Sequence, residues 1–440
     1  MPSIVHRVID VPKPAQSLRW PVVAKLISAR CEPNDVPIRL ALVEHSAGRL
    51  TFELSLLRGT DLGPQRWGSL WQFHPRRRER TERFVALHVV PTGIRAEIGG
   101  FAGDATPATN LLASTCDYLL THPNVVTASD LYWARDNVLY LEGNLLSRFL
   151  IGQIHLLPGQ TRRLGVLIDK PPTTDLLNNV VNAINACRTV GGLAIDPVWV
   201  SEKPFRAEVF YSDSGRALGD ITGLDRVFDV AREAEQCIDA LAITSEIDVS
   251  REVCMDYYSG KPVANPWGGA EAVLTHAVTT MSGLPVAHAP MLTAWENTRV
   301  EGTVDPRDGA EVISMTYFCS VLRGLSAAPQ PVRADGPTVP GSARLTLEDV
   351  GAVVLPASAV GGIPAFAALA QRIPLVLVTE NSTISTLCLD DILENRDPHQ
   401  PEVYVVGNYL EAAGVLTSLR ERLNVDAARR PIFPAQPRWV

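Results

Sequence analysis

A glycine-rich stretch between an apolar run and a proline constrains the fold of this chain more than any other feature. Residues 84–90 form a short apolar run typical of a buried strand. Four glycines lie between 93 and 103, and Thr106-Pro107 then reads as an N-cap followed by a first-turn proline. Such a turn points backbone N–H groups at one spot before the positive end of a helix, which suits a phosphate or carboxylate. The spacing matches neither the P-loop nor the dinucleotide fingerprint, so the stretch locates a site without naming a reaction.

Strand-like and helix-like segments alternate along most of the chain. Apolar runs at 164–168, 240–243, 350–355 and 375–378 are separated by helical patterns at 173–188, 224–237 and 271–281. This alternation predicts an α/β fold of mostly parallel sheets with helices on both faces. Residues 38–44 and 50–56 alternate around a turn at 46–48 and predict a hairpin. We therefore expect a small β-rich N-terminal module that packs against the main body.

Proline, glycine and arginine clusters suggest where the chain divides. Pro75 and the cluster Arg76-Arg77-Arg78-Glu79-Arg80 follow the predicted hairpin, and a stretch rich in Pro and Gly at 330–341 reads as an internal linker. We expect a β-rich module at 1–80 and an α/β domain with the glycine-rich loop at 81–335. The C-terminal α/β segment at 336–440 either completes the same sheet or forms a second lobe.

Charge and cysteine content limit the kinds of partner and the cell compartment that we expect for this protein. The net charge of -8 argues against general nucleic-acid affinity, and the arginine cluster reads as a solvated turn. Seven scattered cysteines contain no C-x-x-C pair, which favours reduced core thiols. The N-terminus lacks the apolar core of a signal peptide, and no apolar run is long enough to span a bilayer. We predict a cytoplasmic protein without nucleic-acid or membrane partners, and a homo-oligomer is left open.

Several separated motifs resemble one family. They are the glycine-rich loop, Thr121-His122-Pro123-Asn124, Gly268-Gly269-Ala270-Glu271-Ala272 with His276, Ala287-His288-Ala289-Pro290, and the Gly361-Gly362 loop. Together they resemble, over about residues 85–400, the domain-of-unknown-function family numbered thirty-three twenty-six. The resemblance implies a fold and recurrent polar positions but no settled activity. Arg95 and Glu97 replace the smaller residues expected in that family's loop, which implies a specialised substrate or a changed activity.

Four residues are candidates for proton transfer: Asp104, His122, His288 and Glu97. Asp104 precedes a helix, where helix capping would also explain a carboxylate. His122 and His288 lie at strand ends, and imidazoles titrate near neutral pH, although a histidine bonded to backbone is the plainer interpretation. Glu97 could act on a substrate or simply pair with Arg95.

The expected substrate-binding groups lie in the glycine-rich turns. Arg95 could clamp an anion with its planar fork, in which case Arg95→Lys should weaken function while leaving folding nearly intact. The loop at 92–107, the turn at 121–124 and the Gly268-Gly269 junction are expected to line one cleft. The predicted binding residues are Arg95, Thr92, Gly93, Gly99, Gly100, Asn124, Gly268, Gly269, Glu271, Ser358, Gly361 and Gly362.

No cofactor is required by the sequence, and a divalent metal is left open. Glu271 and His276 are five residues apart, which excludes the i, i+4 zincin arrangement. His122, Glu271 and His288 could converge on a metal, but nothing in their spacing requires it.

These residues favour an enzyme that acts on a small anionic metabolite by acid–base chemistry, in the lyase or isomerase class. The alternatives are a hydrolase at the same site, with or without a metal, and a non-catalytic small-molecule binding protein. A nicotinamide oxidoreductase ranks lower because the dinucleotide fingerprint is missing.

Overall fold

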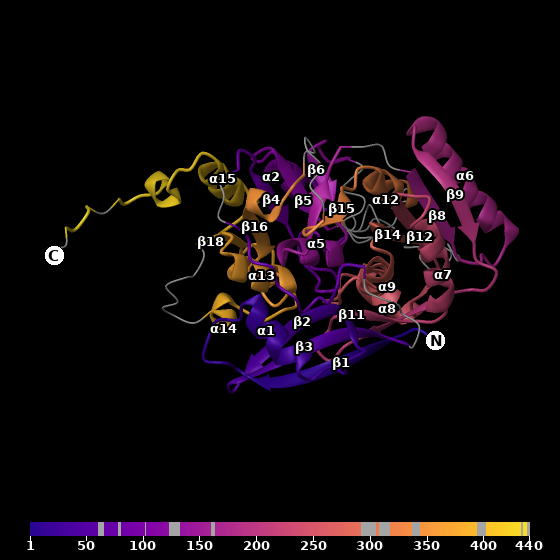
Figure 1. The fold of residues 1–440 in the computed structure, drawn as a ribbon, viewed down its shortest axis with the longest axis horizontal. Helices are drawn as coiled ribbons and strands as arrows, with labels where there is room; N and C mark the ends of the chain where they lie inside the picture. Colours follow the sequence, from indigo (N-terminus) through magenta and orange to yellow (C-terminus); the bar gives the residue numbers. More distant parts are fainter. Residues whose placement is uncertain are drawn as a thin grey trace.

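Two parallel β-sheets organise the chain, and a smaller antiparallel sheet covers part of them (Figure 1). The computed structural model describes residues 1–59, 66–77, 81–101, 103–122, 133–159, 163–291, 305–307, 317–336, 344–393, 402–432 and 434–437. The predicted α/β class with a β-rich N-terminal module is confirmed.

The first sheet has six parallel strands that come from two distant parts of the chain. Numbered along the chain, the strands lie in the order 3-2-1-4-5-6, which is a doubly wound arrangement. From one edge to the other the strands are β6 (Val138–Tyr140), β5 (Tyr118–Thr121), β4 (Val85–His88), β16 (Val350–Pro356), β17 (Leu375–Val378) and β18 (Val403–Val406). The chain adds β5 and β6 toward one edge of the sheet, and β17 and β18 toward the other edge. The strand order therefore reverses between β4 and β16, which pair with each other.

Helices cover both faces of this sheet, which explains why its strands are apolar almost throughout. In β16, Val353 and Leu355 belong to the core cluster of α13 (Ile363–Gln371) and α5 (Gly143–Leu150). Ala352 and Val354 point the other way, into the cluster that holds α2 (Thr106–Ala113) and α15 (Tyr409–Arg420). A strand buried on two faces has no solvated side, so it reads as a continuous run instead of an alternation.

The second parallel sheet is inserted between the two halves of the first. Its order is β14 (Val286–Pro290), β12 (Ala240–Ser245), β8 (Arg163–Ile168), β9 (Ala194–Val200). One face packs with α6 (Thr174–Val190) and α12 (Tyr317–Ser326), and the other with α7 (Leu224–Ala234) and α9 (Pro266–Ser282). The Tyr140 hydroxyl of β6 donates to the Val286 carbonyl of β14, so the two sheets meet edge to edge.

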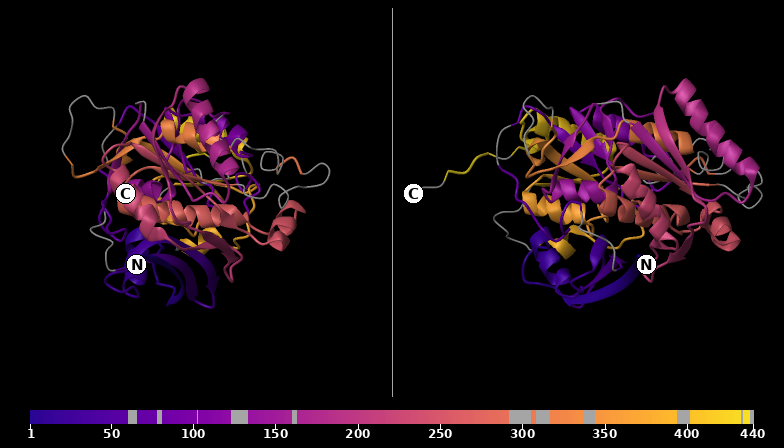
Figure 2. Two further views of the ribbon diagram at one scale, coloured as in Figure 1. Left: turned by 90° about the vertical axis from the view of Figure 1, so that its right-hand side faces the viewer. Right: turned by 45° about the vertical axis from the view of Figure 1, so that its right-hand side comes forward.

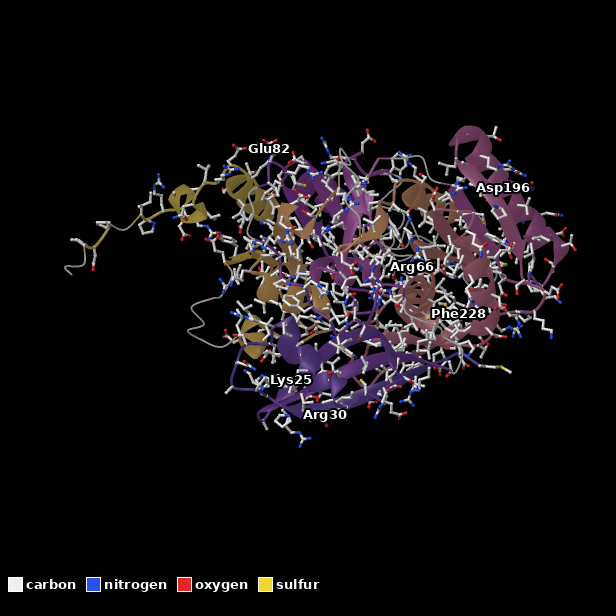
Figure 3. The ribbon with its side chains drawn as sticks, in the orientation of Figure 1. Lys25, Arg30, Arg66, Glu82, Asp196 and Phe228 are labelled. Atoms are coloured by element: carbon white, nitrogen blue, oxygen red, sulfur yellow. The ribbon has the colours of Figure 1, made fainter. Side chains whose placement is uncertain are left out.

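The N-terminal module lies across α13 and α9 (Figure 2). Its antiparallel sheet has the order β1 (Ser3–Pro12), β3 (Arg49–Arg58), β2 (Val36–Ser46). The predicted hairpin turns at Ala47-Gly48, where both residues have positive φ, as the two-residue turns of twisted hairpins require. The sequence did not indicate β1 or α1 (Trp20–Ser28), which packs on α13. Lys25 and Arg30 are exposed at the outer edge of the module (Figure 3).

Other elements correct details of the sequence interpretation. Residues Gln330–Arg333 form β15 and pair with β7 (Ile154–Leu157), so this part of the expected linker is a strand. The helix expected at 271–281 already begins at Pro266, because the Asn265 side chain caps it by accepting from the N–H of Gly268. The remaining elements are β10 (Ala207–Tyr211), β11 (Ala217–Ile221), β13 (Ile247–Asp248), α8 (Arg251–Tyr258) and α14 (Leu389–Ile392).

Within the ranges described above, no helix is both long enough and apolar enough to cross a bilayer.

The contact between α9 and β11 gives a stability prediction. A Cβ added to Gly269 would lie 2.1 Å from the carbonyl oxygen of Ala217, which is backbone and cannot move freely. Gly269→Ala should therefore destabilise the fold by about 1–3 kcal/mol and lower the thermal unfolding temperature measured by circular dichroism. Gly414→Ala in α15 is the matched control: its Cβ meets no atom within 4 Å, so it should be neutral or stabilise by up to about 1 kcal/mol. Equal unfolding temperatures for the two variants would contradict this assignment.

Candidate functional site

A cavity of about 140 Å³ lies at the carboxyl edge of the six-stranded sheet, where the strand order reverses. In doubly wound sheets the loops diverge at this point and leave a crevice, which is the usual place for a ligand. The loops after four adjacent strands line it: Val89, Pro91, Thr92 and Ile94 after β4, His122 after β5, Gly143, Asn144, Leu146 and Ser147 after β6, and Ala359 and Gly361 to Pro364 after β16.

The N-terminal module and α9 close the crevice from the other side. Residues Ile38 to Ala41 of β2, Arg216 just before β11, and Ala272 and His276 of α9 complete the lining. The amide of Leu42 donates to the Gly361 carbonyl at 2.8 Å, so β2 lies directly against the loop after β16. The module is therefore part of the site and not an appendage to it.

A buried carboxylate orients the imidazole of His276. Glu142 Oε1 is hydrogen-bonded to Nδ1 of His276. Glu142 Oε2 accepts from the amides of Asn144 at 2.8 Å and Leu145 at 3.2 Å, so the same carboxylate caps α5. Because a carboxylate accepts, Nδ1 carries the proton and Nε2 keeps its lone pair. Gly143 permits this arrangement, since a Cβ there would lie 2.7 Å from Cε1 of His276. A fixed imidazole with a carboxylate on Nδ1 is the standard arrangement of a protein general base.

His122 is a second imidazole on the cavity, and it is neutral. Burial and, to a smaller extent, the nearby His276 lower the pKa of His122 to about 4, although Glu142 and a hydrogen bond with the backbone of Val90 oppose the shift. At neutral pH this ring therefore carries no charge. Its single N–H is used by the Val90 carbonyl, so its other nitrogen can accept a hydrogen bond from a ligand.

Two arginines give the cavity a positive wall. Arg39 lies 3.3 Å from Glu53, which accepts from Ser214 at 2.5 Å, and Arg216 in turn donates to the Ser214 hydroxyl at 3.1 Å. Burial, together with the charge of Arg39, lowers the pKa of Arg216 to about 10, so Arg216 stays protonated at neutral pH. Burial also lowers the pKa of Arg39, and the Glu53 carboxylate opposes that shift. Two guanidiniums and one carboxylate leave a net positive charge, and α13 begins at this wall with its positive end. An anion is the favoured ligand.

Asn144 adds a hydrogen-bond donor to the lining. Its side chain is 2% exposed, and its Oδ1 accepts from Nε of Arg148 at 2.7 Å. Its Nδ2 is buried and finds no hydrogen-bond partner within the described part of the chain. Buried polar nitrogens are nearly always paired, so this atom points to an acceptor supplied by a ligand or by water.

The structure brings only part of the predicted set into the cavity. Thr92, His122, Gly361 and Gly362 line it. Gly93 and Gly269 pack against Ala217 of β11, and Gly268 lies in the capped first turn of α9. Gly99 lies against the side chain of Val90, and Gly100 lies against the backbone of Ala96. The Ser358 hydroxyl is hydrogen-bonded to that of Thr383 at 2.8 Å. Asn124 lies outside the described residues.

The charged residues of the glycine-rich loop lie apart from the cavity lining. Arg95 is half-buried, with a positive φ of 47°. Glu97 is exposed and pairs with Arg307, so the expected pair of Glu97 with Arg95 does not form. Asp104 accepts from the amide of Gly99 at 2.8 Å and holds the loop closed. The helix after it begins at Thr106, one residue earlier than expected, and the Thr106 hydroxyl donates to the carbonyl of Gly103 and does not cap the helix.

His288 and Glu271 lie in a separate buried chain of hydrogen bonds on the second sheet. His288 Nδ1 is 2.9 Å from Glu271 Oε1, and His288 Nε2 is 2.9 Å from the hydroxyl of Ser245. Within the described ranges no three His, Cys, Asp or Glu side chains gather as metal ligands would. His122, Glu271 and His288, all described, therefore do not form the metal site considered from the sequence.

Comparisons with known proteins give a family without an activity. The model of the family described as "Protein of unknown function (DUF3326)" matches residues 85–429, and the predicted resemblance is confirmed. A protein of Synechococcus sp. called an uncharacterized lipoprotein is 34% identical over 349 residues, which are 78% of this chain and 92% of that protein. No solved structure matches.

The environment of Asp104 gives a pH prediction. Burial raises the pKa of Asp104 from 3.8 to about 7. Between these values the folded state holds a proton that the unfolded state has released, so raising the pH through this window destabilises the fold. Asp104→Asn, which keeps the acceptor for Gly99, should be more stable than wild type at pH 8 by up to about 4 kcal/mol. The difference should vanish near pH 4. Urea unfolding at several pH values measures it, and parallel pH curves for the two proteins would contradict it.

Proposed function

The chain belongs to the DUF3326 family, and we propose that this member is an enzyme that acts on a small anionic metabolite by acid–base chemistry, in the lyase or isomerase class. The observation that carries the proposal is one cavity lined both by His276, whose ring is held by Glu142, and by the arginines Arg39 and Arg216. The first supplies a base, and the second supplies a place for an anion.

The size and lining of the cavity define the substrate class. A volume of about 140 Å³ is close to that of an engineered protein cavity that takes benzene, so the substrate has roughly six to eight non-hydrogen atoms. Arg216 and Arg39 suit a carboxylate or phosphate, and Nδ2 of Asn144 suits a further oxygen. The apolar part of the wall, with Ile38, Leu40, Leu146 and Ile363, suits a short carbon skeleton.

These residues support a proton-transfer sequence. His276 Nε2 removes a proton from the carbon next to a carbonyl or carboxylate, and the carboxylate of Glu142 stabilises the imidazolium that forms. Nδ2 of Asn144 donates a hydrogen bond to the oxygen on which negative charge develops. Return of the proton to a neighbouring carbon gives an isomerisation. Loss of a leaving group from that carbon, with the proton from His276, gives an elimination.

The alternatives use the same cavity. A hydrolase would employ His276 to activate water, with or without a metal, and a binding protein would need only the arginines. The cytoplasmic location and the lack of nucleic-acid and membrane partners stay predictions, as does the open question of a homo-oligomer.

Anion binding is tested first, with a panel of short-chain carboxylates, hydroxy and oxo acids and small phosphate esters. A ligand that binds only the folded state raises the unfolding temperature in proportion to RT ln(1 + [L]/Kd). Arg216→Gln should weaken binding about tenfold to a hundredfold, because one charge-assisted hydrogen bond is worth about 1.5–3 kcal/mol. Arg95→Gln, which changes an arginine outside the lining, is the matched control and should bind normally. Loss of binding in the Arg95 variant alone would move the site to the glycine-rich loop.

Proton transfer is tested on the ligand found in that screen. Wild type in D₂O should exchange a carbon-bound proton of the ligand, as followed by NMR, and His276→Gln should slow the exchange by about 10²–10⁴-fold. His45 is the matched control, because it pairs with Asp391 at 2.7 Å outside the cavity, and His45→Gln should exchange at the wild-type rate. Binding without exchange in wild type would leave a binding protein, and formation of a cleavage product with water would indicate a hydrolase.

A further inference from the structure

Ser245, His288 and Glu271 form a second constellation that the proposed function does not use. The Ser245 hydroxyl, both nitrogens of His288 and one oxygen of Glu271 are joined by two hydrogen bonds of 2.9 Å. The three residues are 1%, 2% and 1% exposed. They come from three elements, so no local motif reveals them: Ser245 ends β12, His288 lies on β14, and Glu271 lies on α9.

The sheet explains why the three side chains meet. β12 and β14 are parallel neighbours, with Ile243 opposite His288 and Ser245 opposite Pro290. Side chains two apart on a strand share a face, so Ser245 points to the same side of the sheet as Ile243. That side is the one covered by α9, which supplies Glu271. Ser245 also stands at the carboxyl end of its strand, the edge at which α/β proteins usually present reactive groups.

The connectivity distinguishes this constellation from a simple buried hydrogen-bond network. In serine nucleophiles that are activated by a histidine, the hydroxyl is bonded to Nε2 of the ring and a carboxylate is bonded to Nδ1. Ser245 and Glu271 are bonded to His288 in the same way. With the carboxylate accepting from Nδ1, Nε2 has the lone pair that can take the hydroxyl proton.

We propose that Ser245 is a nucleophile that accepts an acyl group, with His288 as its base and Glu271 orienting the ring. Oγ of Ser245 attacks the carbonyl carbon of an ester or thioester while its proton moves to Nε2 of His288. The tetrahedral intermediate expels the alcohol or thiol, which takes that proton, and an acyl-serine remains. Water then adds to the acyl-serine with His288 again as base, and the carboxylic acid and free Ser245 are released.

The surroundings indicate the class of acyl donor. The layer between β12 and α9 is apolar, with Ile243 and Val273 fully buried beside the three polar residues. Among the described residues, this layer has no counterpart to the arginine pair of the cavity described above. The donor is therefore an uncharged, short-chain acyl group, and the near-complete burial of Ser245 restricts reaction to small reagents.

A fluorophosphonate probe with a short alkyl chain tests this site in the full-length protein. The probe should become attached to Ser245, as located by peptide mass spectrometry. Ser245→Ala should abolish labelling, and His288→Gln should slow it by about 10³-fold or more. Ser282→Ala is the control and should label at the wild-type rate, because Ser282 is also buried but is hydrogen-bonded to the Val278 carbonyl and the Leu284 amide instead of to a histidine. Wild-type protein that is folded yet stays unlabelled, or that labels at another residue, would overturn the proposal.

Two further measurements show whether a change in labelling comes from a folding defect or from the other cavity. Glu271→Gln keeps the packing and should fold, as judged by its unfolding temperature, yet it should label at least about tenfold more slowly. Normal labelling of a folded Glu271→Gln protein would make the three residues a packing network. The His276→Gln and Arg216→Gln proteins should be labelled at Ser245 at the wild-type rate, because their changes lie in the other cavity. The two proposals can therefore fail independently of each other.

Discussion

The pairing of β4 with β16 is the constraint on which the rest of the structure depends. Val85 and Val350 stand opposite each other although the whole second sheet lies between them in the chain. The pair joins two three-stranded halves into one parallel sheet and makes their connecting loops diverge at its carboxyl edge. The cavity is the space left by that divergence. Any change that separated β4 from β16 would therefore remove the site together with the core.

The crevice becomes a site only when other parts of the chain cover it. β2 contributes Arg39, and the turn before β11 contributes Arg216, while the proposed base His276 comes from α9. The family match begins at residue 85, so His276, Glu142 and Arg216 lie inside it and Arg39 lies outside. The positive wall thus combines one arginine of the family region with one arginine of the N-terminal module.

The sequence predicted the fold class and the edge of the sheet better than the residues of the site. Apolar periodicity and turn residues are local, so the alternation, the hairpin and the loop after β4 could be recognised. The role of Gly269 could not, because the atom that forbids a side chain there belongs to Ala217, far away in the chain. The same is true of Glu142 and His276, which meet only in the folded protein. Glu142 did give a local signal, since it directly follows an apolar strand, whereas Arg39 and Arg216 lie in segments with no motif.

Helix α5 couples the stability of the fold to the chemistry of the cavity. Glu142 caps the helix, Asn144 in the first turn lines the cavity, and the buried Arg148 donates to the side-chain oxygen of Asn144. Arg148 donates to the Gly68 carbonyl and to Gln153, and burial lowers its pKa to about 10 while Glu142 opposes the shift. The carboxylate that caps the helix also orients His276, the proposed base. A substitution at Glu142 therefore has two effects, because it frees the ring of His276 and also loosens the helix that carries Asn144 on the cavity wall.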